Sequence, residues 1–263
     1  MTFAPVLQEV AARISGTEPP TMRTEPSRWA YALREAVSLV APDWIVTHHD
    51  LQLEADAVRS AAPDLDDALD APLEQAAAAS AALELTETLT SLYPQAVVAA
   101  SVSGPAAIAA RLLEGAAAAD PSLDPLDALD LCGDALAGLA AAQIERGAAR
   151  VVVWEPSLGP FEAADVEAAH RPLLRRLETL GAAAVLRSSP ELSGDGYAAH
   201  AMPSSGRAAT LIPLDAFPIE DGDGRDLIAT IESAPVGDVV LTDGPIPRDC
   251  SMSALAGLGR RSR

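Results

Sequence analysis

The sequence predicts an α/β fold, specifically a (β/α)8-type TIM barrel that is incomplete or lacks one strand–helix unit. The chain has 263 residues, an ordinary length for one such barrel. Six short runs rich in Val and Ile end in polar residues, and helical stretches separate them. Repeated strand–helix units indicate a parallel sheet. We therefore expect a single domain over residues 1–263, in which residues 1–42 form an N-terminal helical extension.

The six apolar runs are expected to be the strands. Their apolar residues are continuous rather than alternating, which is typical of strands buried on both faces. The runs are residues 43–50 (DWIVTHHD), 95–104 (QAVVAASVSG), 148–156 (AARVVVWEP), 181–189 (GAAAVLRSS), 208–215 (AATLIPLD) and 236–243 (VGDVVLTD). A closed barrel needs eight strands, so further strands are sought near Val6 and within residues 193–202. The alternative is an open doubly wound sheet, with its ligand at a switch point.

Between these runs the sequence has helical periodicity. The expected helices are residues 27–40, 72–92, 105–113, 125–146, 163–180 and 225–232. Proline opens three of them, at a position that helices tolerate. Gly181 is expected to end the helix before it, because glycine adopts the left-handed C-cap conformation without strain.

Composition limits the classes of partner. The net charge is −20 and every one of the 18 basic residues is arginine. Such a surface repels nucleic-acid phosphate and anionic membranes, so a small molecule is the expected ligand. No apolar stretch is long enough to span a bilayer, and the expected location is cytoplasmic. Cys132 and Cys250 form no metal-ligand motif, so no metal site is predicted from them.

The segment His48-His49-Asp50 is the clearest candidate for chemistry, because it ends an apolar strand. Strand alternation predicts that His48 and Asp50 face the barrel mouth together and that His49 points to the other side. A carboxylate can orient an imidazole for proton transfer, so His48 and Asp50 are the expected catalytic pair. A mixed metal site that adds Glu54 or Glu155 to this pair is a less favoured interpretation. The alternative without chemistry is that these residues cap the strand and pair with nearby arginines.

The other strand ends supply candidate binding residues. Trp154 and Glu155 could form a wall for a flat ligand, and Arg187 could bind a carboxylate or phosphate. The full expected binding set is His49, Trp154, Glu155, Arg187, Asp215 and Asp243. Each of these carboxylates, taken alone, is as compatible with a helix N-cap or a loop anchor as with ligand binding. His170 is expected to be solvated on its helix or to interact with the C-terminal end of the helix dipole. His200 is expected to lie in a surface loop, with a place in a lid as the alternative.

Several of these segments carry a family resemblance. Residues 43–58 (DWIVTHHDLQLEADAV) resemble the first strand and turn of the uroporphyrinogen decarboxylase family, where an apolar strand ends in an Asp. Residues 95–106, 143–158, 180–189, 208–217 and 239–258 resemble later strands of that family in the same order. The resemblance covers most of the chain. Its wider superfamily includes corrinoid- and thiol-dependent methyltransferases and cobalamin-independent methionine synthase, all on (β/α)8 barrels.

The resemblance implies a decarboxylase or methyltransferase acting on a small or tetrapyrrole-type anionic ligand. In it, Asp50 would stabilise positive charge, His48 would shuttle protons and Arg187 would anchor a carboxylate. A decarboxylase needs no cofactor, whereas a methyltransferase would use a corrinoid or a folate.

The chain also departs from the family. The N-terminal Arg23 and Arg28 match no substrate-gripping motif, and the zinc-binding His-x-Cys of the methyltransferase branch is replaced by Arg187-Ser188-Ser189. The chain is short, with one late strand–helix unit expected to be missing. These losses support a second hypothesis, a non-catalytic barrel that docks through its Ala-rich helices to a second copy or a partner subunit.

Overall fold

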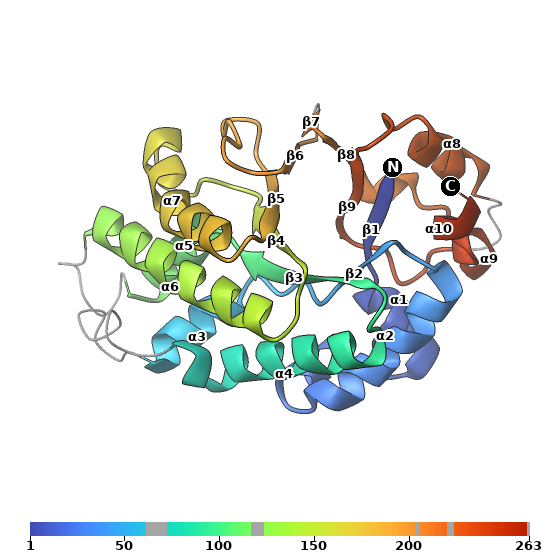
Figure 1. Ribbon diagram of the computed structural model, residues 1–263, viewed down its shortest axis with the longest axis horizontal. Helices are drawn as coiled ribbons and strands as arrows, with labels where there is room; N and C mark the ends of the chain where they lie inside the picture. The colour runs from blue at the N-terminus through green and yellow to red at the C-terminus, as the bar shows by residue number, and fades with distance from the viewer. Residues whose placement is uncertain (62–72, 117–123, 204–205, 220–223, 262–263) are drawn as a thin grey trace.

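The computed structural model describes residues 1–61, 73–116, 124–203, 206–219 and 224–261. Within these residues the strands form two sheets (Figure 1). The larger sheet has the order β2 (Trp44–Val46), β3 (Val97–Ser103), β4 (Arg150–Glu155), β5 (Ala183–Ser188), β6 (Ala199–Ala201) and β7 (Gly206–Arg207). The smaller has the order β1 (Thr2–Val6), β9 (Val239–Pro245) and β8 (Ala209–Ile212). All neighbours pair in parallel except β6 and β7.

The two sheets meet where β1 lies beside β2. The Asp43 N–H donates to Phe3 O at 2.9 Å, and the Phe3 N–H donates to Asp43 Oδ2 at 2.9 Å. At the other edge β6 lies beside β8. No strand ladder of the described residues crosses either junction. The prediction of a parallel α/β fold is therefore confirmed, but the strands are joined as two sheets and not as one closed barrel.

All six predicted strands are present. The two regions searched for further strands also contain them, as β1 and β6. The part of the chain that the structure describes thus has eight parallel strands. The expected loss of a strand is wrong: what is missing is helix, because the segments that follow β5 and β6 contain none among their described residues.

The remaining strand connections carry helices, which cover the outer faces of the sheets (Figure 1). They are α1 (Gln8–Ser15), α2 (Pro26–Val40), α3 (Leu53–Ala61), α4 (Ala77–Leu92), α5 (Pro105–Ala116), α6 (Pro125–Glu145), α7 (Ala163–Thr179), α8 (Arg225–Glu232), α9 (Met252–Leu255) and α10 (Leu258–Arg261). The 3-10 turns of the described residues are η1 (Pro19–Arg23), η3 (Leu73–Gln75) and η4 (Leu214–Ala216).

Local sequence explains several helix ends. Asp124 caps α6 by accepting a hydrogen bond from the Leu126 N–H at 2.8 Å, and Pro125 follows at the first helical position. After α7 the chain turns through Gly181, whose φ of +66° is the left-handed conformation expected there. The prediction that residues 1–42 are a helical extension is wrong in part, because this segment begins with β1 and supplies a strand of the smaller sheet.

Small side chains fill the space between the sheets. This interior cluster consists of alanine, valine and leucine residues together with Trp154. Bulkier clusters lie between the strands and the helices, where leucine predominates. Burying apolar area contributes roughly 25 cal/mol per Å² to folding, so these outer clusters supply most of the hydrophobic stabilisation.

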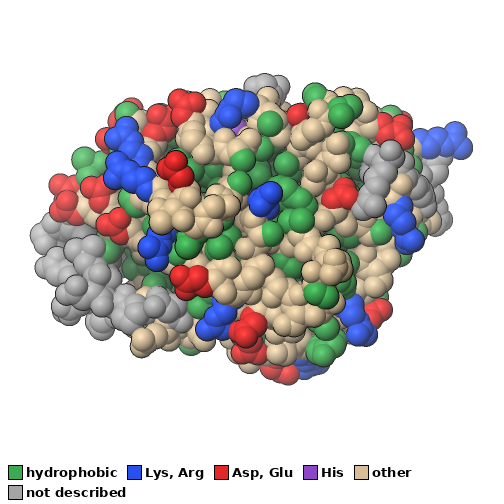
Figure 2. Space-filling view, in the orientation of Figure 1, with side chains coloured by type: hydrophobic (Ala, Val, Ile, Leu, Met, Phe, Trp, Pro, Cys, Tyr) green, Lys and Arg blue, Asp and Glu red, His purple; other side chains and the backbone are tan. Residues whose placement is uncertain are grey.

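The surface is strongly charged. Figure 2 shows acidic side chains and arginines spread around the rim of one face, with hydrophobic side chains gathered nearer its centre. None of the described helices is both long and apolar enough to cross a membrane.

Candidate active site at the carboxyl ends of the strands

The ends of β4 and β5 present polar residues in two opposite directions. Trp154 belongs to the interior cluster with Val152, whereas Val151 and Val153 pack among the outer helices. In β5, Val185 faces the interior and Leu186 the helices. Because side chains alternate along a strand, Trp154 and Arg187 share the inner face, and Glu155 and Ser188 the outer face.

Four inner side chains from four strand ends converge. His49 lies edge-on to Trp154, with 4.7 Å between ring centroids. Arg187 donates from Nε to Asp243 Oδ1 at 2.7 Å, and its Nη2 also bonds that oxygen. The charges of Arg187 and Asp243 both act on His49. We call His49, Trp154, Arg187 and Asp243 the mouth cluster.

The mouth cluster is held in place and reachable. The Trp154 indole donates to Ser101 Oγ at 2.8 Å, which fixes the ring. The side chains of Arg187 and Asp243 are 13% and 26% exposed. Burial lowers the pKa of His49, and the charge of Arg187 acts in the same direction. A His49 imidazole that is neutral near pH 7 can accept a proton.

Asp50 is held by Arg23, to which the sequence analysis had assigned no role in the site. Arg23, at the end of η1, donates to Asp50 Oδ2 from Nε at 2.7 Å and to Asp56 Oδ2 from Nη1 at 2.6 Å. Burial favours the protonated form of Asp50, but hydrogen bonds from Arg23 and from the Gln52 N–H outweigh it and lower the pKa. Asp50 is therefore a carboxylate at neutral pH. Arg28, by contrast, pairs with Glu25 at an exposed site.

The expected sides of the two histidines are wrong. It is His49 whose ring contacts Trp154, while His48 is buried beside Thr47, with Nδ1 3.0 Å from Thr47 Oγ1. The reason is that β2 ends at Val46, so strand alternation stops there. Thr47 Oγ1 accepts from the Ser101 N–H at 3.1 Å, and the His49 N–H donates to Gln8 Oε1 at 2.9 Å, which turns the chain.

Two sealed ionisable groups lie beside the mouth. Burial lowers the pKa of His48 to about 4, and its Nε2 has no hydrogen-bond partner among the described residues. Burial raises the pKa of Glu54 to about 7, although Ser103 donates to Glu54 Oε2 from Oγ at 2.8 Å. Neither side chain is more than 3% exposed, so neither can meet a ligand directly.

Glu155 and Asp215 do not join the mouth cluster, which corrects their expected role. Glu155 is fully buried on the outer face, where it accepts the Ala106 N–H at 3.0 Å and the Ala107 N–H at 2.8 Å, at the N-terminus of α5. Its carboxyl oxygens therefore cap the first turn of that helix. Asp215 is exposed on η4, because β8 ends at Ile212, before Pro213.

The other two histidines are also buried, contrary to expectation. His170 on α7 is 3% exposed and lies 2.5 Å from the Tyr197 hydroxyl through Nδ1. His200 lies on β6, where its Nε2 is 2.6 Å from Ser188 Oγ. The sequence Ala199-His200-Ala201 did carry a signal of a short strand with His200 on one face.

The zinc of the methyltransferase branch does not fit these residues. The matching strand end carries Arg187 and Ser188, and no group of three His, Cys, Asp or Glu suited to a metal occurs in the described part of the chain. Burial raises the pKa of Cys132 to about 12 and that of Cys250 to about 11, so both thiols stay protonated. A cysteine binds zinc as the thiolate, so neither thiol is prepared for zinc.

Comparisons with known proteins establish the fold. No family model matches the chain, and no curated protein matches its sequence. A solved methyltransferase from Methanosarcina mazei superposes with a TM-score of 0.73 at 16% identity, covering 98% of this chain and 93% of that one. Dihydrodipicolinate synthase from Oceanobacillus iheyensis superposes with a TM-score of 0.35 at 11% identity, over 80% of this chain and 69% of that one. The first alignment shows that the chain shares the fold of a methyltransferase.

Proposed function

We propose that this chain is a methyltransferase-like enzyme of the uroporphyrinogen decarboxylase superfamily, and that the mouth cluster binds a small anionic substrate. The observation that carries the proposal is the convergence of a guanidinium, an imidazole and an indole at the carboxyl ends of β2, β4 and β5. Enzymes built on barrels of this kind place their chemistry at that end.

Arg187 is suited to hold the anion. Asp243 engages Nε and Nη2, and Nη1 donates to no described residue. The free edge of a guanidinium matches a carboxylate or phosphate better than an ammonium would. Asp243 fixes the direction of the guanidinium, so little side-chain entropy is lost when substrate binds. A small-molecule ligand also agrees with the net charge of −20, which disfavours nucleic acid.

His49 replaces His48 in the proton-transfer role. It is the histidine that faces the other mouth residues, and Trp154 supports its ring. In methyl transfer, His49 would accept the proton of an acceptor O–H, N–H or S–H group as that atom bonds to the methyl group. A methylated corrinoid or a folate would supply the methyl group. No zinc-activated thiol is part of this proposal.

Decarboxylation is the second candidate chemistry, and one observation favours it. Arg23 keeps Asp50 ionised at the edge of the mouth, with a side chain that is 27% exposed. A carboxylate there would stabilise positive charge on a protonated pyrrole ring, which is the role that the family resemblance implies.

The test compares three proteins with the wild type: Arg187→Met, His49→Gln and, as a control, Arg28→Met. Each is assayed with methylcobalamin and small thiol or carboxylated acceptors, and with uroporphyrinogen for decarboxylation. For the substrate that wild type turns over, we expect Arg187→Met to raise KM at least tenfold. We expect His49→Gln to lower kcat about 100-fold, as loss of a general base does. Arg28→Met should match wild type.

Two results would contradict the proposal. Unchanged kinetics in Arg187→Met would show that the anion binds elsewhere. A folded wild type that binds none of these compounds would instead favour the partner-dependent, non-catalytic barrel.

A further inference from the structure

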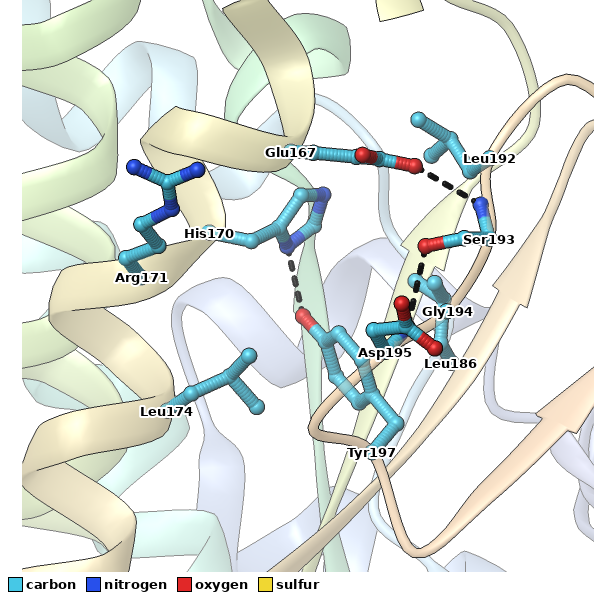
Figure 3. Close-up of a pocket in the computed structure, with 10 residues that line it drawn as sticks. All are labelled: Glu167, His170, Arg171, Leu174, Leu186, Leu192, Ser193, Gly194, Asp195 and Tyr197. Carbon is cyan, nitrogen blue, oxygen red and sulfur yellow. Dashed lines mark hydrogen bonds between the residues drawn. The ribbon is translucent and has the colours of Figure 1, made fainter. Parts of the chain in front are cut away.

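A cavity lies away from the mouth cluster, on the outer face of β5. Residues 189–198, which join β5 to β6, take the place of a helix and run beside α7. Together these two segments enclose a cavity of about 180 Å³ (Figure 3). We call it the outer cavity. It is smaller than the roughly 300–1,000 Å³ of sites for drug-sized ligands, so its size suits a small metabolite.

Hydrogen bonds fix the walls of the outer cavity. The Ser193 N–H donates to Glu167 Oε1 at 2.8 Å, tying the loop to α7. Arg207 donates to the carbonyl oxygens of Gly194 and Tyr197 at 2.7 and 3.0 Å. Gly194 lies against the His200 ring, where a Cβ would come within 2.3 Å of Nδ1. These hydrogen bonds fix the loop, and a preformed site loses less entropy on binding.

The base of the outer cavity carries a polar pair from both walls. Burial raises the pKa of Tyr197 well above its ordinary value, so its hydroxyl keeps its proton, and this oxygen lies 2.5 Å from His170 Nδ1. His170 Nε2 lies 3.4 Å from Glu155 Oε2 but has no hydrogen bond to any described residue. Buried polar atoms in native proteins are nearly always satisfied by protein, water or a ligand.

The rim of the outer cavity carries both signs of charge. Arg171 on α7 and Asp195 on the loop are exposed, and neither forms an ion pair with a described residue. One oxygen of Glu167 is used by the loop. Leu174, Leu186 and Leu192 supply an apolar wall. An anion alone would leave Asp195 unpaired and a cation alone would leave Arg171 unpaired, whereas a zwitterion would engage both.

We propose that the outer cavity binds a free α-amino acid with a short apolar side chain. Its carboxylate would pair with Arg171, its ammonium group with Asp195 and Glu167, and its side chain would pack on the leucines. This site shares no residue with the mouth cluster, so the inference does not depend on the chemistry proposed there.

Isothermal titration of the full chain with leucine and valine tests this site. We expect binding by wild type, and at least tenfold weaker binding by Arg171→Ala and by Asp195→Asn. Arg175→Ala is the matched control, because Arg175 is exposed on the same helix but does not line the cavity. It should bind within twofold of wild type, as should Arg187→Met in the mouth cluster.

Two analogues distinguish a zwitterion site from a simple ionic one. Leucine amide lacks the carboxylate and 2-hydroxy-4-methylpentanoate lacks the ammonium group, so both should bind at least tenfold more weakly than leucine. Equal binding of either analogue overturns the assignment. So does the absence of heat with every amino acid at about 10 mM, a concentration that reveals a Kd near 1 mM.

Discussion

The adjacent residues Trp154 and Glu155, at the end of β4, point to opposite faces of the sheet. Trp154 points inward and contacts His49; it is buried itself, but it belongs to the mouth cluster, in which the Arg187 and Asp243 side chains are 13% and 26% exposed. Glu155 points outward, is fully buried and binds the first turn of α5. In β5 the same division separates Arg187 from Ser188. Chemical type at a strand end therefore does not predict a ligand contact; the direction of the side chain does.

The largest expected effect concerns the sealed outer face. Gly104 precedes α5, and a Cβ there would lie 2.2 Å from Glu155 Oε2. We expect Gly104→Ala to lower the free energy of unfolding by about 2 kcal/mol, because overpacking a buried site forces its neighbours to move. Urea denaturation measures the loss.

A control substitution and a double-mutant cycle with Glu155 test this prediction. Gly138 on α6 is exposed with open space around it, so Gly138→Ala should stabilise by about 0.5–1 kcal/mol. Glu155→Ala should cost about 3 kcal/mol on its own, because the Ala106 and Ala107 N–H groups lose their buried acceptor. Adding Gly104→Ala to that variant should cost almost nothing further. Full additivity would mean that Gly104 and Glu155 do not interact as described.

Most of the strands could be predicted from the sequence, because long runs rich in Val and Ile are typical of strands buried on both faces of a parallel sheet. The strands β1 and β6 were weaker signals, since they have five and three residues. The lack of a helix among the described residues after β5 and β6 agrees with the sequence analysis, which expected no helix between residues 180 and 225.

The candidate site was harder to predict because it depends on where each strand stops. Trp154, Arg187 and Asp243 were expected together and lie together, since their strands continue to those residues. The histidines were misassigned because β2 stops at Val46. Arg23 was noted only as matching no substrate-gripping motif. Its pairing with Asp50 could not be predicted, because the two residues are distant in sequence and only tertiary packing brings them together.

A pH titration distinguishes the two sealed groups beside the mouth. His48 has a pKa near 4 in the fold against 6.5 ordinarily, so its contribution to stability is lost as the pH falls. Glu54 has a pKa near 7 against 4.5, so the fold retains its proton and stability declines as the pH rises from 4.5 to 7. The two trends oppose each other in wild type.

Glu54→Gln removes one of these trends. Its unfolding free energy relative to wild type should therefore increase with pH, by about 1 kcal/mol per pH unit between about pH 5 and 6.5, because one pKa unit corresponds to about 1.4 kcal/mol. Chemical denaturation at three pH values measures this change. Parallel curves for the two proteins would mean that Glu54 titrates normally.

The smallest effect is expected on the inner face. Arg187→Met removes an ion pair whose members are 13% and 26% exposed, and water can solvate the Asp243 carboxylate that remains. We expect a loss of at most about 1 kcal/mol in unfolding free energy, as for other accessible ion pairs, measured by urea denaturation beside Glu155→Ala. A loss near 3 kcal/mol would mean that the Arg187–Asp243 pair is as inaccessible to water as Glu155 is. Arg187 could then not bind a substrate. A small loss, together with the tenfold change in KM proposed above, would mean that the ion pair contributes little to folding and keeps Arg187 oriented for ligand binding.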